Sequence, residues 1–196
     1  MKALHTLPEN YRQIFSVDLQ KDTKLALLIN VFALLIAAVL VVPMHFYIPI
    51  STLFDMEKGL GAYILRFGVL LLALVAYMVL HELVHGITMK LCGTKKVRYG
   101  FTGLYAFAGS EDYYDKRSYI AIALAPVVVW GVVLAVVNAL VSAEWFWVVY
   151  LIQIGNLSGA AGDLYVTVKF SKFPKDLLVQ DSGVSMTVYS ASVAEE

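Results

Sequence analysis

The stretch His81-Glu82-Leu83-Val84-His85 has the residue types and spacing best suited to chemistry in this chain. Two histidines four positions apart lie on one face of an α-helix, so both imidazoles can reach one metal ion. The glutamate between them is turned aside and can move protons instead of binding the metal. The pattern predicts a zinc site with its own general base, as in metal-dependent proteases. In a soluble helix a chance match is common, so the setting of the motif matters.

The motif ends an apolar run, and the whole chain is apolar. Of its 196 residues, 60% are hydrophobic and only 15% are charged, whereas soluble domains average about 45–50% apolar and about 25% charged residues. The composition therefore predicts an integral membrane protein. Ionisable side chains are costly inside a bilayer and usually have a function there, which favours metal binding by the two histidines. The net charge of zero predicts no nucleic-acid partner.

Apolar segments predict an all-α polytopic membrane protein with about four transmembrane helices, since a span needs roughly 20 mostly apolar residues. We expect a cytosolic segment over 1–23, a membrane domain over 24–170 and a polar, loosely ordered tail over 171–196. The predicted helices cover about 24–42, 61–91, 118–142 and 145–170, and Pro43 is expected to end the first.

Between the second and third predicted helices, apolar alternation and glycines in residues 94–110 predict two short strands in a β-hairpin-like segment. Lys and Arg concentrate in the N-terminal segment, in this connection and after the fourth helix. Cytosolic loops carry such an excess of basic residues. We therefore expect a multi-pass protein of a bacterial or archaeal cell membrane with both termini in the cytosol.

A catalytic zinc usually takes three protein ligands and keeps one position open. Apart from Glu82, Asp163 is the only acidic residue well inside a predicted apolar helix. Asp163 precedes Lys169, and His85 precedes Lys90, by similar stretches of helix, which puts both about 8–9 Å from the cytosolic surface at roughly 1.5 Å per residue. The matched depth predicts Asp163 as the third ligand. The alternative is an acid that only caps its helix at the lipid interface.

Asn156 lies about two turns before Asp163 on nearly the same face of the predicted fourth helix. Its amide could bind the substrate backbone or steady an oxyanion. The alternative is an ordinary hydrogen bond between packed membrane helices.

The chain resembles the site-2 protease-like intramembrane zinc metalloproteases, in their compact branch, the putative zincin peptidases. The resemblance covers roughly residues 60–170 and rests on His81-Glu82-Leu83-Val84-His85-Gly86 and on Asn156 and Asp163 two helices later. The usual family form has a Pro between Asn and Asp and a Gly after the Asp, whereas this chain has no such Pro and has Leu164.

The resemblance implies a core made of the last three predicted helices, with the first helix an addition. It implies Zn²⁺ held by His81, His85 and Asp163, with Glu82 as the general base and Asn156 as an oxyanion group. The implied activity is hydrolysis of peptide bonds in membrane-embedded substrates, so the expected partners are the lipid bilayer and a membrane protein or peptide. The sequence sets no oligomeric state.

The same ligands fit two other functions. A metal transporter or sensor would need a ladder of ligands across the bilayer or a His-rich loop, and the sequence offers one polar cluster. An inactive relative that binds a membrane partner would have no need of a base such as Glu82 in apolar surroundings.

Overall fold

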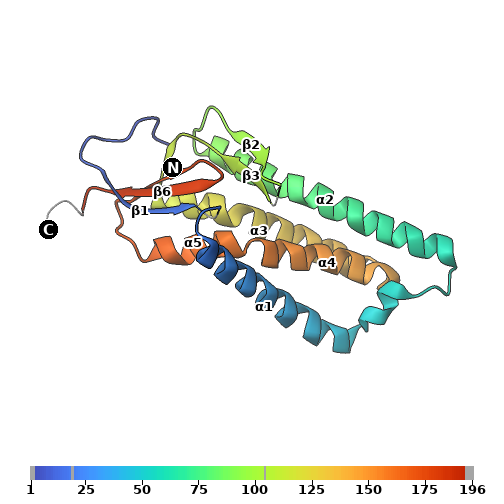
Figure 1. The fold of residues 1–196 in the computed structure, drawn as a ribbon. Helices are drawn as coiled ribbons and strands as arrows, with labels where there is room; N and C mark the ends of the chain where they lie inside the picture. Colours follow the sequence, from blue (N-terminus) through green and yellow to red (C-terminus); the bar gives the residue numbers. More distant parts are fainter. Residues whose placement is uncertain (1–2, 19, 104, 193–196) are drawn as a thin grey trace. The chain divides into compact units, whose positions relative to one another are not determined.

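The computed structural model describes residues 3–18, 20–103 and 105–192 (Figure 1). The chain divides into two compact units. Unit 1 comprises Met1–Ile29, His81–Pro126 and Gly162–Glu196, and unit 2 comprises Asn30–Leu80 and Val127–Ala161. In chain order the elements are β1 (Arg12–Asp18), α1 (Thr23–Tyr47), the 3₁₀ helix η1 (Ile50–Phe54), α2 (Leu60–Leu91), β2 (Arg98–Phe101), β3 (Ala106–Gly109), β4 (Tyr113–Asp115), α3 (Lys116–Leu140), α4 (Ala143–Gly159), α5 (Ala161–Ser171), β5 (Leu178–Asp181) and β6 (Ser185–Ser190).

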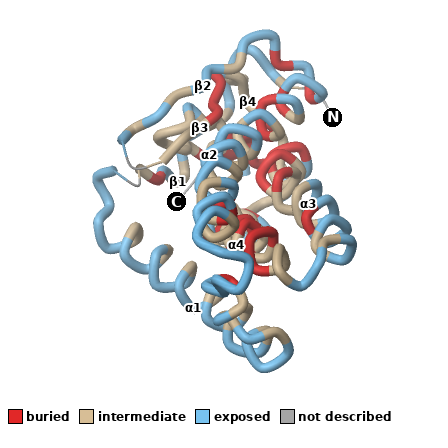
Figure 2. Tube along the Cα trace, turned by 90° about the vertical axis from the view of Figure 1, so that its right-hand side faces the viewer, coloured by how far each residue is buried: buried red, intermediate tan, exposed pale blue. Residues whose placement is uncertain are grey.

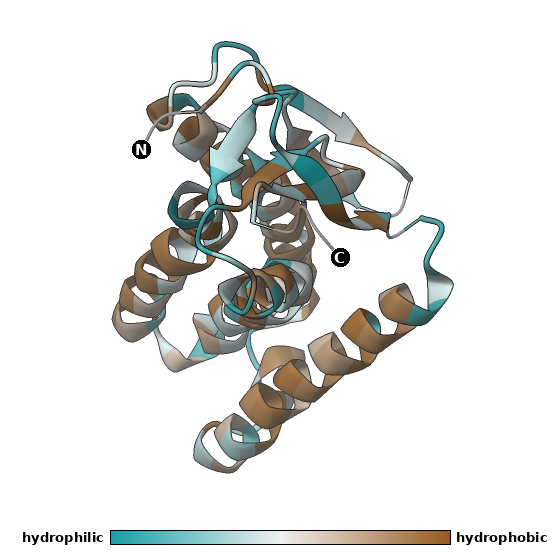
Figure 3. Ribbon diagram, turned by 90° about the vertical axis from the view of Figure 1, so that its left-hand side faces the viewer, coloured by the Kyte–Doolittle hydropathy of each residue, from teal (hydrophilic) through white to brown (hydrophobic). Residues whose placement is uncertain are grey.

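Three helices in the described ranges, α1, α2 and α3, are long and apolar enough to cross a membrane. Figure 3 shows these helices as largely hydrophobic, whereas the strands carry more hydrophilic residues. α1 extends past the predicted end, and Pro43 lies within its last turns. Membrane helices tolerate proline because neighbouring groups can satisfy the freed carbonyl.

The predicted fourth span, 145–170, is two helices in the structure. α4 ends at Gly159, α5 begins at Ala161, and Ala160 between them has the non-helical angles φ −82° and ψ 16°. Gly159 and Gly162 flank this break, and each glycine costs about 1 kcal/mol of helix stability relative to alanine. The prediction of about four spans therefore differs from the structure here, since α4 has 17 residues and α5 has 11.

Unit 2 packs around Trp147, which is fully buried and donates its indole N–H to the Ile48 carbonyl at 3.0 Å. Figure 2 shows buried residues gathered along α4. Arg66 of α2 is also buried, and its guanidinium donates to the carbonyls of Thr52 at 2.7 Å and Leu53 at 3.0 Å. A buried cation in an apolar helix thus satisfies the backbone of η1, which links α1 to α2.

Unit 1 contains all the strands. β2 and β3 pair antiparallel from Arg98↔Gly109 to Phe101↔Ala106, so a hairpin lies within the predicted segment. A second, four-stranded antiparallel sheet has the order β1-β6-β5-β4. The protein is mostly helical, as predicted, but an all-α fold was too narrow an expectation.

The four-stranded sheet draws on the N-terminal segment and on the tail that was expected to be loosely ordered. β1 comes from the N-terminal segment, and β5 and β6 come from the C-terminal tail. Val179 and Val188 in the two middle strands are fully buried in the core of unit 1. The burial explains why this tail is ordered: its strands supply core side chains beneath the ends of α2, α3 and α5.

Candidate metal centre

The last turns of α2 and the first turn of α5 bring three predicted ligands together in unit 1. His81 Nε2 lies 3.2 Å from His85 Nε2. The Asp163 carboxylate completes the group, with Oδ2 at 3.6 Å from His81 Nε2 and Oδ1 at 3.7 Å from His85 Nε2. Four-residue spacing on a continuous helix accounts for the histidine pair.

These distances fit a zinc ion. Tetrahedral zinc with bonds of about 2.0–2.2 Å holds its ligand atoms about 3.3–3.6 Å apart, close to the 3.2–3.7 Å found among these three side chains. Two imidazole nitrogens and a carboxylate are also a donor set that catalytic zinc uses. The three side chains are 12%, 11% and 25% exposed, so a small ligand can reach them.

His85 is held in one orientation by the backbone of α3. Its Nδ1 lies 2.9 Å from the carbonyl oxygen of Ile122. Because a carbonyl only accepts, Nδ1 must carry the proton, and Nε2 then presents its lone pair toward His81 and Asp163. Such a partner fixes the tautomer of a metal-binding histidine and raises its basicity.

The Ile122 carbonyl is available because of Pro126 within α3. In a regular helix the N–H of residue 126 would bond to the carbonyl of residue 122, and proline has no N–H. The proline that breaks this intrahelical bond therefore leaves an acceptor for His85.

Asp163 lies in the first turn of α5, not toward the cytosolic end of one long helix as expected. A carboxylate at this position is favoured by the partial positive charge at the helix start. Asp163 can therefore both stabilise the start of its helix, the alternative that the sequence left open, and bind the metal.

Glu82 belongs to the same group. Potential ligand atoms of His81, Glu82 and His85 all lie within 4.8 Å of one another. The carboxylate of Glu82 also interacts with the backbone N–H of Ala108 in β3. An acid at this distance can exchange protons with a water held by the histidines, and β3 steadies it.

Asn156 belongs to unit 2 and is fully buried there. Its Oδ1 accepts a hydrogen bond from the Tyr77 hydroxyl at 2.9 Å, and its Nδ2 donates to the Val127 carbonyl at 3.2 Å. Both ends of the carboxamide are thus engaged within unit 2, which favours the packing alternative.

Several other groups near the histidines were not predicted from the sequence. A Cβ at Gly86 would lie 1.9 Å from the Tyr99 hydroxyl, so β2 presses on α2 directly after His85. Tyr119 donates to Asp181 at 2.6 Å, and Asp181 lies within electrostatic range of His85 and Asp163. Burial raises the pKa of the Asp181 carboxyl, and the Tyr119 hydrogen bond opposes that rise. Only Gly86, which follows the motif, gave a signal in the sequence.

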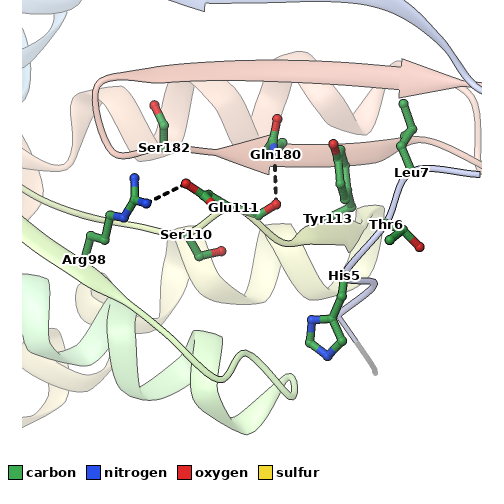
Figure 4. Close-up of a pocket in the computed structure, with 9 residues that line it drawn as sticks. All are labelled: His5, Thr6, Leu7, Arg98, Ser110, Glu111, Tyr113, Gln180 and Ser182. Carbon is green, nitrogen blue, oxygen red and sulfur yellow. Dashed lines mark hydrogen bonds and ion pairs between the residues drawn. The ribbon is translucent and has the colours of Figure 1, made fainter.

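A separate open pocket of about 630 Å³ also lies in unit 1 (Figure 4). Two of its lining residues pair with each other, Arg98 with Glu111 at 2.5 Å, and His5 pairs with Asp112, which does not line the pocket, at 2.8 Å. The lining residues are His5, Thr6, Leu7, Arg98, Ser110, Glu111, Tyr113, Gln180 and Ser182. The pocket therefore does not include the predicted ligands.

Two histidines and a glutamate in this arrangement, with a carboxylate from a distant helix, have the residue types that zinc-dependent peptidases use. The sequence matches the family described as "Putative zincin peptidase" over residues 74–178, more than half of the chain, and the protein belongs to that family. Zinc is accordingly its cofactor. The matched span includes the motif in α2 and Asp163 in α5.

The chain is also similar to a protein of Pyrococcus woesei named "Uncharacterized 24.7 kDa protein in gap 5'region". The two are 31% identical over 127 residues, which is 60% of this chain and 53% of that protein. The chain thus spans about half the length of the curated relative it matches. No solved structure matches the fold.

Zinc content provides a first test of the ligand set. We expect His81→Ala and Asp163→Ala to bind far less than the wild-type amount of about one zinc per chain. His45→Ala is the matched control, because His45 Nδ1 accepts the Ile50 N–H at 3.2 Å in α1 and η1, and it should keep its zinc. Metal analysis of the purified variants measures this. Wild-type zinc content in Asp163→Ala would remove Asp163 from the ligand set.

Asn156→Ala separates the two readings of Asn156. The substitution leaves the buried Tyr77 hydroxyl and Val127 carbonyl without their partner, which costs about 1–3 kcal/mol. We therefore expect a lower unfolding temperature in detergent and an unchanged kcat for the folded protein. A reduced kcat with an unchanged unfolding temperature would instead give Asn156 the oxyanion role.

Proposed function

We propose that this zinc peptidase is an intramembrane endopeptidase of the site-2 protease type, which hydrolyses peptide bonds of membrane-embedded substrates. One observation carries the proposal. His81, Glu82 and His85 lie on α2, a helix of 32 residues that is long and apolar enough to cross a membrane. Ionisable residues in a membrane helix cost free energy and usually have a function there, so three of them on such a helix support a site within the membrane.

In this mechanism Glu82 transfers the protons. Its carboxylate takes a proton from the attacking water as the water oxygen bonds to the scissile carbonyl carbon. It then gives that proton to the amide nitrogen as the carbon–nitrogen bond breaks, which leaves a new carboxyl group and a new amine. The backbone N–H of Ala108 interacts with this carboxylate and favours its charged form, which is the form that accepts the proton.

His81, His85 and Asp163 would hold the zinc. When bound, zinc supplies a Lewis acid that acidifies a water molecule and polarises the scissile carbonyl. The hydrogen bond from His85 Nδ1 to Ile122 keeps the second imidazole turned toward the metal.

We further propose that the β2–β3 hairpin binds the substrate as an added strand. A peptide bond inside a helix is shielded by its own hydrogen bonds, so the substrate must become extended, and a strand edge offers the replacement bonds. The support is that β3 is already beside the base, since the Ala108 backbone contacts Glu82. Pairing along this hairpin would therefore deliver the substrate next to the proton acceptor.

The proposed setting is a bacterial or archaeal cell membrane, with both termini and the hairpin on the cytosolic side. The support is the concentration of Lys and Arg in the N-terminal segment, between α2 and α3, and after α5. The lipid bilayer and a membrane protein or peptide would be its partners.

Glu82→Gln tests the peptidase. The amide keeps the size of the side chain but accepts no proton, so we expect at least about a hundredfold loss of kcat on a labelled membrane peptide, in the range typical of a lost general base, with zinc retained. Glu57→Gln is the control, because Glu57 is exposed in the connection before α2. Full cleavage by Glu82→Gln would disprove the mechanism. Zinc flux into proteoliposomes without any cleavage would favour a transporter.

Phe101→Pro tests the strand edge. Phe101 is 61% exposed in β2, and proline there removes an N–H from the hairpin. We expect KM for an extended peptide to rise by about tenfold, because lost pairing weakens substrate binding. Phe101→Ala keeps the N–H and is the control. An unchanged KM in Phe101→Pro would exclude the hairpin as the substrate site.

A further inference from the structure

The turn between β5 and β6 contacts β3, whose backbone interacts with Glu82, and it is hydrogen-bonded to α3, whose backbone orients His85. It comprises residues 182–184 together with the flanking strand ends Asp181 and Ser185, and it lies beyond residue 178, where the family match ends. We propose that this turn positions both functional residues at once, with Asp181, Tyr119 and Gly109 as positioning residues. The proposal rests on the proposed function of the metal centre and adds the part of the chain that sets its geometry.

The first connection runs through β3 to Glu82. A Cβ at Gly109 would lie 2.2 Å from the Ser182 carbonyl carbon and 2.4 Å from the Gly183 nitrogen. The Ser110 N–H donates to the Asp181 carbonyl at 2.7 Å. The end of β3 therefore rests directly on the backbone of the turn, with no space for a side chain between them.

The turn meets β3 at a second point. Gly183 has φ +89°, which favours glycine, and a Cβ there would lie 2.2 Å from a ring carbon of Phe107. The turn thus contacts β3 on both sides of Ala108, at Phe107 and at Gly109. Ala108 is the residue whose N–H interacts with Glu82. A shift of the turn must therefore move the contact that steadies the base.

The second connection runs through α3 to His85. Asp181 Oδ2 accepts the Tyr119 hydroxyl at 2.6 Å, and Oδ1 accepts the Gly183 N–H at 2.8 Å. Tyr119 is 3% exposed, so this bond is shielded from water. Ile122, about one turn further along α3, provides the carbonyl that holds His85 Nδ1. The Asp181 side chain therefore fixes both the turn and the helix that orients His85.

The two connections predict different defects. Tyr119→Phe removes the link to α3, and Asp181→Asn weakens it, so both should reduce zinc affinity by about tenfold or more, as is typical when a partner of a metal ligand is lost. They should also shift the visible spectrum of the cobalt-substituted protein. Gly109→Ala pushes β3 away from the turn, so kcat should fall by about tenfold with metal affinity unchanged.

Asp176→Asn is the matched control. Asp176 precedes the β5–β6 pair and accepts three hydrogen bonds. The donors are Ser190 Oγ at 3.0 Å and the backbone N–H groups of Ala191 at 2.9 Å and Ser192 at 3.1 Å. These bonds hold the far end of β6 and not the turn. Asp176→Asn should lower the unfolding temperature and leave metal affinity, the cobalt spectrum and kcat unchanged.

The measurements use the full-length protein in detergent: zinc affinity by chelator competition, the Co²⁺ spectrum, kcat and KM on a labelled membrane peptide, and thermal unfolding. If Tyr119→Phe and Asp181→Asn behave like Asp176→Asn, the turn only supports stability and the proposal is overturned. Wild-type kcat in Gly109→Ala would likewise overturn the connection to Glu82. A wild-type protein that cleaves no peptide would reject the proposed function instead, while the metal affinities and spectra still test the connection to His85.

Discussion

The hydrogen bond between His85 Nδ1 and the Ile122 carbonyl is the interaction on which the geometry of the metal centre depends. The Ile122 carbonyl lacks its usual helical donor, because Pro126 has no N–H. With Nδ1 occupied, Nε2 must face His81 and Asp163. The proline in α3 therefore frees the carbonyl that orients the second histidine of α2.

The metal centre lies in the unit that contains the sheets. His81, Glu82, His85 and Asp163 all belong to unit 1, together with every strand. Unit 2 consists of apolar helical segments and η1, with Trp147 and Arg66 at well-packed positions. A polar sheet offers backbone donors and acceptors that apolar helices use up internally. The candidate ligands and Glu82 thus belong to the unit that holds these strands.

The sequence predicted α2 and its motif well, because periodicity and metal-ligand spacing are local properties. It also predicted the hairpin in residues 94–110 and selected Asp163, since an acid in an apolar segment is rare. It missed the four-stranded sheet, in which β1 pairs with β6 and β4 with β5, because pairing between distant segments leaves no local pattern. It also missed the break at Ala160. The role of the Ile122 carbonyl was missed because every residue has a backbone carbonyl, so its presence marks no particular position.

The break at Ala160 has a consequence for the topology of the chain. Asp163 lies in the first turn of a separate helix, α5, and its carboxylate lies near His81 and His85, which are remote in sequence. A metal shared by α2 and α5 would act as a cross-link that closes a very long loop of polypeptide. Such closure removes entropy from the unfolded chain, and metal binding to a site that exists only after folding adds its free energy to the folded state. The ion proposed for hydrolysis would then also stabilise the fold of unit 1.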